Sequence, residues 1–399
     1  MPYKICLVLV GKLPALPTKG GAIETLTKHL LNENEKDPQV EFTVLSMAEP
    51  QAMEQAKAYK HAKFVWFKPY HLWNKVWWRV RTLGLKLGRQ EIPFPYQRVK
   101  GADWLKQHWQ EFDCILAESE LEMIRDAKIP PEKVLYHLHW TGKPSQQNDS
   151  QFGTLIAVSD YIAQSWKNAT GRSQEAISVL RNCIDPEKFY HQEGEKARRE
   201  IRQKWGIPED KFTLFSCGRI IPEKGFRELI QAMGMLQEPA ALIVAGGVNF
   251  GLKEQTSYEK ELHELAERSG QQIVFTGFIH NDQLPQYYAA ADLIAIPSIW
   301  QDPAPLVPIE AMAMGRPIVA TRSGGMPEYL GESCGRILPI DNQLPKHLAQ
   351  TIDELHADPE LRRCMAEQGP VQAQNFNTRN YYQNFLAIVA DHLARNGEK

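Results

Sequence analysis

The chain has 399 residues, more than one hydrophobic core usually contains, which predicts two domains of roughly 150–200 residues each. Its composition, 43% hydrophobic and 24% charged with a formal net charge of −2, is that of an ordinary globular protein and argues against a generic nucleic-acid binder. Residues 1–180 carry 23 Lys/Arg against 19 Asp/Glu, a balance of +4, whereas the remainder carries 23 against 29, a balance of −6. We therefore expect the first half to meet any acidic partner or surface.

The first apolar run, ICLVLV at 5–10, is too short for the core of a signal peptide or for a membrane span, and we expect it to form a buried strand. Six cysteines are scattered without a CxxC pair or a metal-ligand spacing. This pattern predicts reduced core thiols in a cytosolic protein.

Short apolar runs alternate with segments of helical period along the whole chain. Strands are predicted at 3–10, 41–47, 62–67, 112–118, 133–140, 154–159 and 177–182, and then at 212–218, 240–247, 272–278, 292–298, 316–323 and 335–340. Helices are predicted at 24–36, 160–168, 225–236, 256–270, 284–291 and 309–315. Continuous apolar strands separated by amphipathic helices predict parallel sheets that are covered on both faces.

The strand pattern restarts near Phe212. We expect a first domain at 1–185, a linker at 186–210 and a second domain at 211–375, with a C-terminal helix at 376–395 that packs back on the first domain. Ligands bind open α/β sheets outside the carboxyl ends of the strands. Two such sheets facing each other would place the ligand in a cleft between the domains.

Gly20 and Gly21 follow the first strand and lead directly into a helix. Because they lack side chains, backbone N–H groups could approach an anion there, although a plain loop is the alternative. Neither GxxxxGK[ST] nor GxGxxG occurs in the chain, which argues against P-loop enzymes and enzymes with a dinucleotide fingerprint.

Arg219 and Lys224 lie between the first strand of the second domain and the helix that follows it. Two cations at the carboxyl end of a sheet suit a doubly charged phosphate group, which arginine binds as a fork and lysine as a point charge. A solvated pair of loop residues is the alternative.

The stretch IWQDPAPLVPIEAMAMG, at 299–315, places three prolines just before a helical pattern. Proline is tolerated only in the first turn of a helix, so Pro308 predicts that the helix begins close to Leu306. The N–H groups of Leu306 and Val307 would then be free at the positive end of the helix dipole, where they suit a phosphate.

Two carboxylates flank this helix start. Glu310 lies one turn beyond Leu306 on the same face and could accept hydrogen bonds from ligand hydroxyls, as could Asp302 just before the turn. The alternative is that Glu310 caps its own helix and that Asp302 is an N-terminal cap.

The chain resembles the retaining GT-B glycosyltransferases of family 4 over nearly its whole length, in motifs that occur in that family's order. They are GRIIPEKG (218–225), HNDQLPQYYAAADLIAIPS (280–298) and D-x7-E (302–310) followed by AMAMGRPIVAT, with the Gly-Gly loop, AVSDYI (157–162) and VLRNCIDPEKF (179–189). The spore-coat and surface-polysaccharide branch is the most similar, because KLPALPTKGGAIE and WQDPAPLVPIEAMA resemble its forms of both loops.

The resemblance implies an α/β GT-B fold with two doubly wound, Rossmann-like domains facing an interdomain cleft. It implies the transfer of a hexose, with retention of the anomeric configuration, from a nucleoside diphosphate donor to a hydroxyl of a glycan or lipid-linked acceptor. The implied setting is cell-surface polysaccharide synthesis. A UDP-sugar is the favoured donor and GDP-mannose the next. No Asp-x-Asp occurs, so we expect neither a donor-bound metal nor another cofactor.

The resemblance also assigns roles to the residues of the matching motifs. Arg219 and Lys224 would hold the donor diphosphate, with help from the Leu306 and Val307 amides. Glu310 would hold the ribose hydroxyls and Asp302 the hydroxyls of the transferred sugar. Gly20 and Gly21 would close over the phosphates from the other domain.

His139, in YHLHW, matches the family's histidine near the donor sugar. His137 lies on the same face and competes for that role, and a satisfied core histidine is a further alternative. The chain departs from the family at Asp302, where glutamate is usual, and at Ala304-Pro305, which replaces Phe-Gly. These changes shorten one carboxylate and remove one backbone donor, so an altered donor range is expected.

Residues 55–90 contain nine Lys/Arg and no acid, interleaved with Trp66, Trp73, Trp77 and Trp78. This composition favours an anionic membrane surface and thus a cytoplasmic protein that is peripheral on the inner face of the cell membrane. The alternative is that the tryptophans belong to the core.

Two other functions remain open from the sequence. One is a sugar-nucleotide epimerase or hydrolase of the same architecture, and the other is a non-catalytic protein that binds a sugar nucleotide or acts as a scaffold.

Overall fold

The structure is a computed structural model that describes most of the chain. The described residues are 2–11, 13–18, 21–69, 76, 79–80, 96–118, 121–143, 153–173, 177–190, 194–247 and 256–397. They form two compact units. Unit 1 comprises Met1–Arg181 and Thr378–Lys399, and unit 2 comprises Asn182–Asn377.

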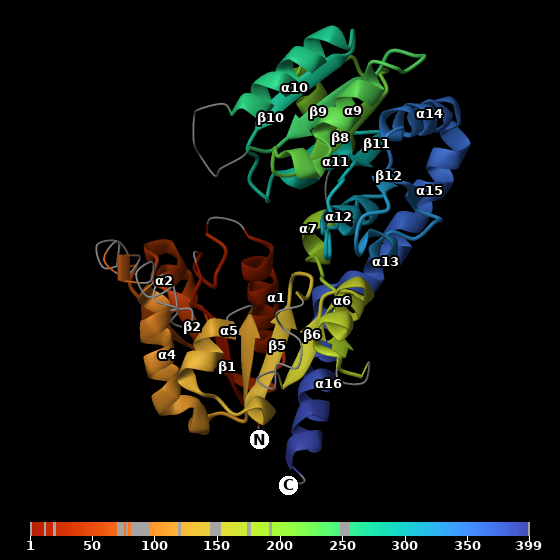
Figure 1. The fold of residues 1–399 in the computed structure, drawn as a ribbon. Helices are drawn as coiled ribbons and strands as arrows, with labels where there is room; N and C mark the ends of the chain where they lie inside the picture. Colours follow the sequence, from red (N-terminus) through yellow and green to blue (C-terminus); the bar gives the residue numbers. More distant parts are fainter. Residues whose placement is uncertain are drawn as a thin grey trace. The chain divides into compact units, whose positions relative to one another are not determined.

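Unit 1 is built around a seven-stranded parallel sheet with the strand order β3-β2-β1-β4-β5-β6-β7 (Figure 1). Its strands are β1 (Tyr3–Leu9), β2 (Val40–Met47), β3 (Ala62–Phe67), β4 (Cys114–Glu118), β5 (Val134–Leu138), β6 (Thr154–Ala157) and β7 (Ile177–Val179). Its helices are α1 (Ala22–Lys36), α2 (Pro50–Ala56), α4 (Tyr96–His108), α5 (Leu121–Ala127), α6 (Asp160–Thr170) and α16 (Thr378–Gly397), with 3-10 turns at Trp109–Glu111 and Pro131–Lys133.

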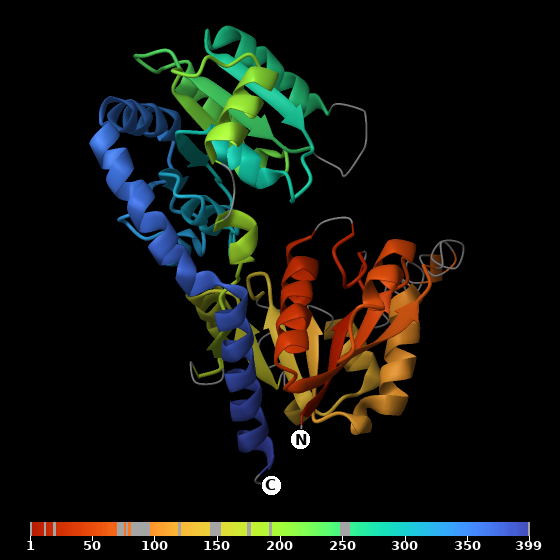
Figure 2. The ribbon, with the colours of Figure 1, turned by 180° about the vertical axis from the view of Figure 1, so that it is seen from behind.

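The central strands of unit 1 are buried on both faces, as their unbroken apolar runs require. The C-terminal helix α16 packs beside α1, and Figure 2 shows both from behind. Phe385 of α16 stacks on Phe42 of β2 with ring centroids 6.4 Å apart, and the Tyr382 hydroxyl donates to Asn34 Oδ1 at 2.6 Å. Helix α16 therefore contributes to the core of unit 1, although it comes from the other end of the chain.

Unit 2 contains a six-stranded parallel sheet with the strand order β10-β9-β8-β11-β12-β13. Its strands are β8 (Thr213–Cys217), β9 (Ala241–Ala245), β10 (Gln272–Gly277), β11 (Leu293–Ile296), β12 (Ile318–Thr321) and β13 (Gly335–Leu338). Its helices are α7 (Pro186–Tyr190), α8 (Gly194–Lys204), α9 (Phe226–Met233), α10 (Ser257–Arg268), α11 (Leu284–Ala290), α12 (Val307–Ala313), α13 (Met326–Tyr329), α14 (Leu344–Ala357) and α15 (Pro359–Ala373), with 3-10 turns η5 (Pro222–Lys224) and η6 (Gln374–Phe376).

The sheet of unit 2 separates two apolar clusters. Helices α9, α10 and α14 pack together in one cluster, and α8, α11, α12 and α13 contribute to the other. Together with the parallel sheet of unit 1, this arrangement confirms the predicted α/β class with two doubly wound, Rossmann-like sheets.

The boundary between the units differs from the expected linker at 186–210. The two units meet in sequence at Arg181 and Asn182, and helices α7 and α8 belong to unit 2. The charged helix α8 resembles a solvated segment, but its Arg202 is fully buried. The guanidinium donates to Asp292 Oδ2 at 2.8 Å and to several backbone carbonyl oxygens, those of Ala290, Pro208, Glu209 and Lys211. This network, which sequence patterning does not reveal, fixes α8 against α11.

We expect the substitution Arg202→Leu to destabilise unit 2 by about 3–5 kcal/mol, because it removes the five hydrogen bonds that the buried guanidinium donates to Asp292 and to four carbonyl oxygens, although Arg198 and the Thr213 N–H still donate to Asp292. Arg199→Leu, at an exposed position of the same helix, is the matched control and should change the stability by less than about 0.5 kcal/mol. Urea unfolding of both full-length variants measures this difference. Equal midpoints would show that the Arg202 network contributes nothing to stability.

Candidate functional site

The loops after β8 and β11 of unit 2 are held together at the carboxyl edge of the sheet. Gly225 has a φ of 71°, and a Cβ atom there would lie 1.9 Å from the Pro297 carbonyl oxygen. The Glu223 carbonyl accepts from the backbone N–H groups of Ile299 and Trp300 at 3.0 and 3.1 Å. Only glycine at 225 permits this close approach, and it brings Lys224 next to the loop that carries Asp302.

Lys224 and Asp302 form an ion pair, with 2.6 Å between Nζ and Oδ2, and both side chains are mostly buried. A second loop holds the Asp302 backbone, because Gly325 N donates to the Asp302 carbonyl at 2.9 Å. A Cβ atom on Gly324 would lie 2.2 Å from the same oxygen, so this approach also requires glycine. The sequence did not predict the ion pair. Asp302 does not cap helix α12, because Leu306 is its N-cap residue.

Helix α12 begins at Val307, close to the start that the prolines predicted, with Pro308 in its first turn. The Leu306 carbonyl accepts from Glu310 N at 3.0 Å, which closes the first turn. Arg219, after β8, is exposed on the loop that leads to Lys224. The carboxyl edge of this sheet therefore presents two cations and the first turn of a helix, the groups that the sequence assigned to a phosphate ligand.

The Glu310 carboxylate accepts a hydrogen bond from the buried Tyr288 hydroxyl at 2.6 Å, and the Cys217 sulfur lies 3.5 Å from the same hydroxyl. The pKa of Glu310 is raised overall, because burial outweighs the lowering effects of the Tyr288 hydrogen bond and of the nearby Lys188. Glu310 therefore does not cap its own helix, which excludes that alternative. Tyr288 fixes the orientation of the carboxylate, and its place in an apolar helix pattern gave no sign of this role.

The edge of unit 1 also collects polar residues. Gly21 is the N-cap residue of α1 with a φ of 110°, and a Cβ atom there would lie 2.0 Å from Glu24 Oε2. The pKa of Glu24 is raised to about 7, mainly by burial and to a smaller extent by the charge of Glu118, and its own backbone N–H opposes the shift. The Glu24 carboxyl group therefore lies next to Gly21, at the helix start where the anion site was predicted. Gly20 lies outside the described residues.

Glu118, at the end of β4, lies between two histidines of unit 1. His137 of β5 is its direct partner in the strand register, and His139 follows on the same face. The Glu118 carboxylate lies 3.1 Å from His137 Nδ1 and 2.7 Å from His139 Nε2. Burial alone would raise the pKa of Glu118, but the two histidines hold it well below its usual range.

Burial, with a smaller contribution from His137, lowers the pKa of His139, although Glu118 opposes the shift. Across the residues that the structure describes, Glu118, His137 and His139 form the one group that offers three possible metal-ligand atoms, all within 4.8 Å of one another. Sequence reasoning identified both histidines but missed Glu118, although an acid at the end of the buried run CILAE was a usable signal.

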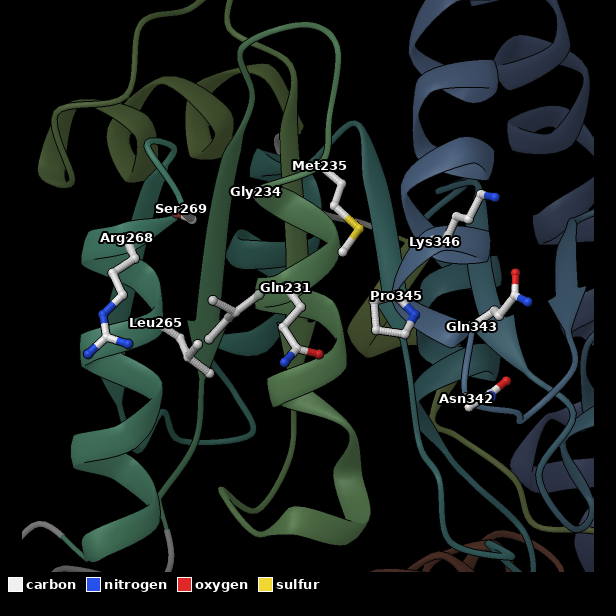
Figure 3. A pocket seen from close by; sticks show the side chains of 11 residues that line it. Gln231, Gly234, Met235, Leu265, Arg268, Ser269, Asn342, Gln343, Pro345 and Lys346 are labelled. Atoms are coloured by element: carbon white, nitrogen blue, oxygen red, sulfur yellow. The ribbon is translucent and has the colours of Figure 1, made fainter.

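A separate cavity of about 620 Å³ lies on unit 2 between α9, α10 and the start of α14 (Figure 3). It contains none of the predicted site residues. Its lining is Ile230, Gln231, Gly234, Met235, Leu265, Arg268, Ser269, Asn342, Gln343, Pro345 and Lys346. With no acid, histidine or cysteine among these residues, the cavity offers no catalytic group of those kinds.

No helix within the described ranges is both long and apolar enough to cross a membrane. In residues 55–90, Lys57, Lys60, Lys63 and Lys68 are exposed. Trp66 is half-buried and stacks on Phe64, with ring centroids 5.3 Å apart. The other three tryptophans that the sequence assigned to a membrane surface lie outside the described residues.

Comparison with known proteins shows which family and which fold this chain resembles. Residues 197–372 match the family Glycosyl transferases group 1. Spore coat protein SA of Bacillus subtilis is 27% identical over 96% of this chain and 98% of its own length. Lipopolysaccharide 1,2-N-acetylglucosaminetransferase of Salmonella typhimurium is 26% identical over 69% of each chain.

Among solved structures, Anabaena Alr3699/HepE in complex with UDP and glucose superposes with a TM-score of 0.73 at 22% identity. The match covers 98% of this chain and 100% of that chain. The protein therefore has the GT-B fold, and the residues that match the glycosyltransferase group 1 family lie in unit 2. The matched span begins inside α8, which agrees with the assignment of that helix to unit 2.

The raised pKa of Glu24 predicts a pH dependence of stability. When the pH is below 4.5, the ordinary pKa of glutamate, the Glu24 carboxyl is protonated in both the folded and the unfolded chain. Between pH 4.5 and about 7 the unfolded chain releases this proton first, so the stability that Glu24 contributes is lost as the pH rises. Glu24→Gln remains neutral and avoids this loss.

We expect the stability of Glu24→Gln relative to the wild type to increase by about 2 kcal/mol from pH 5 to pH 8. Thermal and urea unfolding across this range measures the effect, and Glu41→Gln, at an exposed position of β2, is the control that should show no such trend. A relative stability that stays constant with pH would contradict the raised pKa of Glu24.

Proposed function

We propose that the protein is a retaining hexosyltransferase that moves a sugar from a nucleoside diphosphate donor to a hydroxyl of a glycan or lipid-linked acceptor. A UDP-sugar is the favoured donor, GDP-mannose the next, and cell-surface polysaccharide synthesis the proposed setting. The observation that carries the proposal is the carboxyl edge of unit 2, where the loop after β8 carries Arg219 and Lys224, the ion pair joins Lys224 to Asp302 on the loop after β11, and Glu310 lies in α12, all within the matched span 197–372. The names of the two relatives support a surface-polymer role.

The diphosphate would lie against the cations and the helix start. Arg219 and Lys224 would stabilise the negative charge that develops on the departing diphosphate, together with the N–H groups of Leu306 and Val307. Glu310, held by Tyr288, would accept hydrogen bonds from the ribose hydroxyls. Asp302 uses Oδ2 for Lys224, and its second oxygen would accept from a hydroxyl of the transferred sugar. In unit 1, Gly21 and Gly20 would approach the phosphates, and His139 would contact the sugar.

The transfer step would break the bond between the sugar anomeric carbon and the phosphate oxygen and form a bond from that carbon to the acceptor oxygen. Attack on the face that the diphosphate leaves would retain the configuration, and the acceptor proton would pass to the released phosphate. The proposal assigns neither Asp302 nor Glu310 the role of nucleophile, since Asp302 pairs with Lys224 and Glu310 with Tyr288. We propose that the reaction requires neither a metal nor a resident cofactor.

The decisive experiment compares Lys224→Ala and Glu310→Ala with the wild type against a panel of UDP-, GDP- and ADP-sugars. We expect Lys224→Ala to reduce kcat about 10²–10³-fold, because a charge-stabilising donor is lost. Glu310→Ala should raise KM about tenfold or more, because the ribose loses a charged hydrogen-bond acceptor. Lys346→Ala, at an exposed position of unit 2, is the matched control.

Turnover at the wild-type rate in both variants would remove the site assignment. Nucleotide binding by thermal shift with no transfer to any acceptor would favour the non-catalytic alternative. Activity that is lost on chelation would contradict the metal-independent mechanism.

We also propose that residues 55–90 attach the protein to the anionic inner face of the cell membrane, where a lipid-linked acceptor would lie. Support comes from the sequence, which has no acid in this range, and from the exposed lysines Lys57, Lys60, Lys63 and Lys68. Basic residues near an anionic bilayer each contribute about 1 kcal/mol at low salt.

Sedimentation with phosphatidylglycerol vesicles should therefore show binding that weakens with salt, and phosphatidylcholine vesicles should show none. The double substitution Lys60→Glu and Lys63→Glu should weaken binding about tenfold or more, whereas Lys260→Glu with Lys346→Glu, on unit 2, should not. Absence of binding at every salt concentration would remove the membrane proposal without affecting the transferase proposal.

A further inference from the structure

The group formed by Glu118, His137 and His139 is a buried hydrogen-bond network in the middle of the unit 1 sheet. Strands β4 and β5 are neighbours there, and their register places Glu118 directly opposite His137. Glu118 is 4% exposed and His137 is 1% exposed, whereas the His139 side chain reaches 11%. Within this network His137 is closed to solvent, whereas His139 is partly accessible.

The carboxylate determines which nitrogen of each ring carries a hydrogen. An ionised carboxylate only accepts hydrogen bonds, so each ring must donate to Glu118 through the nitrogen that faces it. His137 donates from Nδ1 and His139 from Nε2. In the neutral rings the hydrogen-free nitrogens are then His137 Nε2 and His139 Nδ1.

The two hydrogen-free nitrogens have different surroundings. His137 Nε2 is completely buried and has no hydrogen-bond partner within the part of the chain that the structure describes. Because this nitrogen is sealed from solvent, the polar contact of His137 is the one that Nδ1 makes with Glu118, and His137 acts as an anchor for the carboxylate. His139 lies just beyond the end of β5, at the carboxyl edge where ligands of such sheets bind, and it is the more exposed of the two rings.

We propose that Glu118 is a positioning residue that holds His139 in one orientation and in the tautomer with hydrogen on Nε2, so that Nδ1 accepts a hydrogen bond from a sugar hydroxyl. The inference rests on the proposed function only for the identity of the ligand. A lone pair at Nδ1 accepts from O–H groups and repels the oxygens of a phosphate. His139 therefore selects the hydroxylated ring of the substrate rather than its diphosphate.

The substitution Glu118→Gln tests this assignment with almost no change in size. A glutamine side chain presents one oxygen and one NH₂ group. In either orientation the NH₂ group takes a position 3.1 Å from His137 Nδ1, where it favours the other tautomer of that ring, and in one orientation it also faces His139 Nε2. Nitrogen NMR of ¹⁵N-histidine-labelled protein reports the tautomer of each ring, and the His139 signals are identified by their absence in His139→Gln. We expect Nε2–H for His139 in the wild type and a changed tautomer for His139 or His137 in Glu118→Gln.

Kinetics provide the functional readout. Glu118→Gln should lower kcat for transfer about tenfold or more, the effect of one lost hydrogen bond, with little change in the binding of UDP alone measured by thermal shift. Glu118→Asp retains the charge and should keep the wild-type tautomers with intermediate activity, which keeps the test informative if the glutamine variant does not fold. Glu111→Gln, at an exposed position of unit 1, is the control.

Three results would overturn the proposal. The first is a wild-type His139 with hydrogen on Nδ1. The second is a Glu118→Gln variant with unchanged histidine signals and unchanged kcat. The third is stoichiometric Co²⁺ binding with a ligand-field spectrum that disappears in Glu118→Gln, which would make the group a metal centre. If the wild type transfers no sugar at all, the proposed function fails, while the tautomer measurement still decides whether Glu118 fixes the ring.

Discussion

The close approach of two loops at the carboxyl edge of unit 2 is the constraint on which the candidate site depends. Parallel strands deliver the loops after β8 and β11 to the same edge, but parallel pairing alone does not bring their side chains into contact. Contact requires Gly225 to lie against the Pro297 carbonyl and Gly324 against that of Asp302, at separations that no Cβ atom allows. These two glycines make the 2.6 Å pair of Lys224 and Asp302 possible.

Three acids of the candidate sites have a hydrogen-bonding or ion-pair partner. Lys224 neutralises Asp302, Tyr288 donates to Glu310, and two histidines surround Glu118. Such partners fix the orientation of each carboxylate, which is the preorganisation that an active site requires. Lys224 and Tyr288 engage one oxygen each of Asp302 and Glu310, so the second oxygen of each carboxylate can still accept a hydrogen bond.

The sequence predicted what depends on local patterns and missed what depends on contacts between distant segments. Prolines determine where a helix can begin, so the start of α12 close to Leu306 was predictable. The strands of both sheets were predictable as well, because a continuous apolar run is also a local pattern. Glu118 and Tyr288 were missed because each takes its role from a partner on another element. Residues 186–210 resembled a linker because the partners of the buried Arg202 are mostly backbone carbonyl groups, which leave no pattern in the sequence.

The two edges differ in the ligand group that they can hold. The edge of unit 2 presents cations and a helix start, whereas that of unit 1 buries Glu24 and Glu118 beside two histidines. The Glu24 carboxyl uses its own backbone N–H, in the first turn that an anion at Gly21 would need. An ionised Glu24 and a bound phosphate would therefore exclude each other, and the pKa of about 7 allows the neutral form near physiological pH. A proton on Glu24 would therefore favour phosphate binding at this helix start, because it removes the negative charge nearest to the ligand.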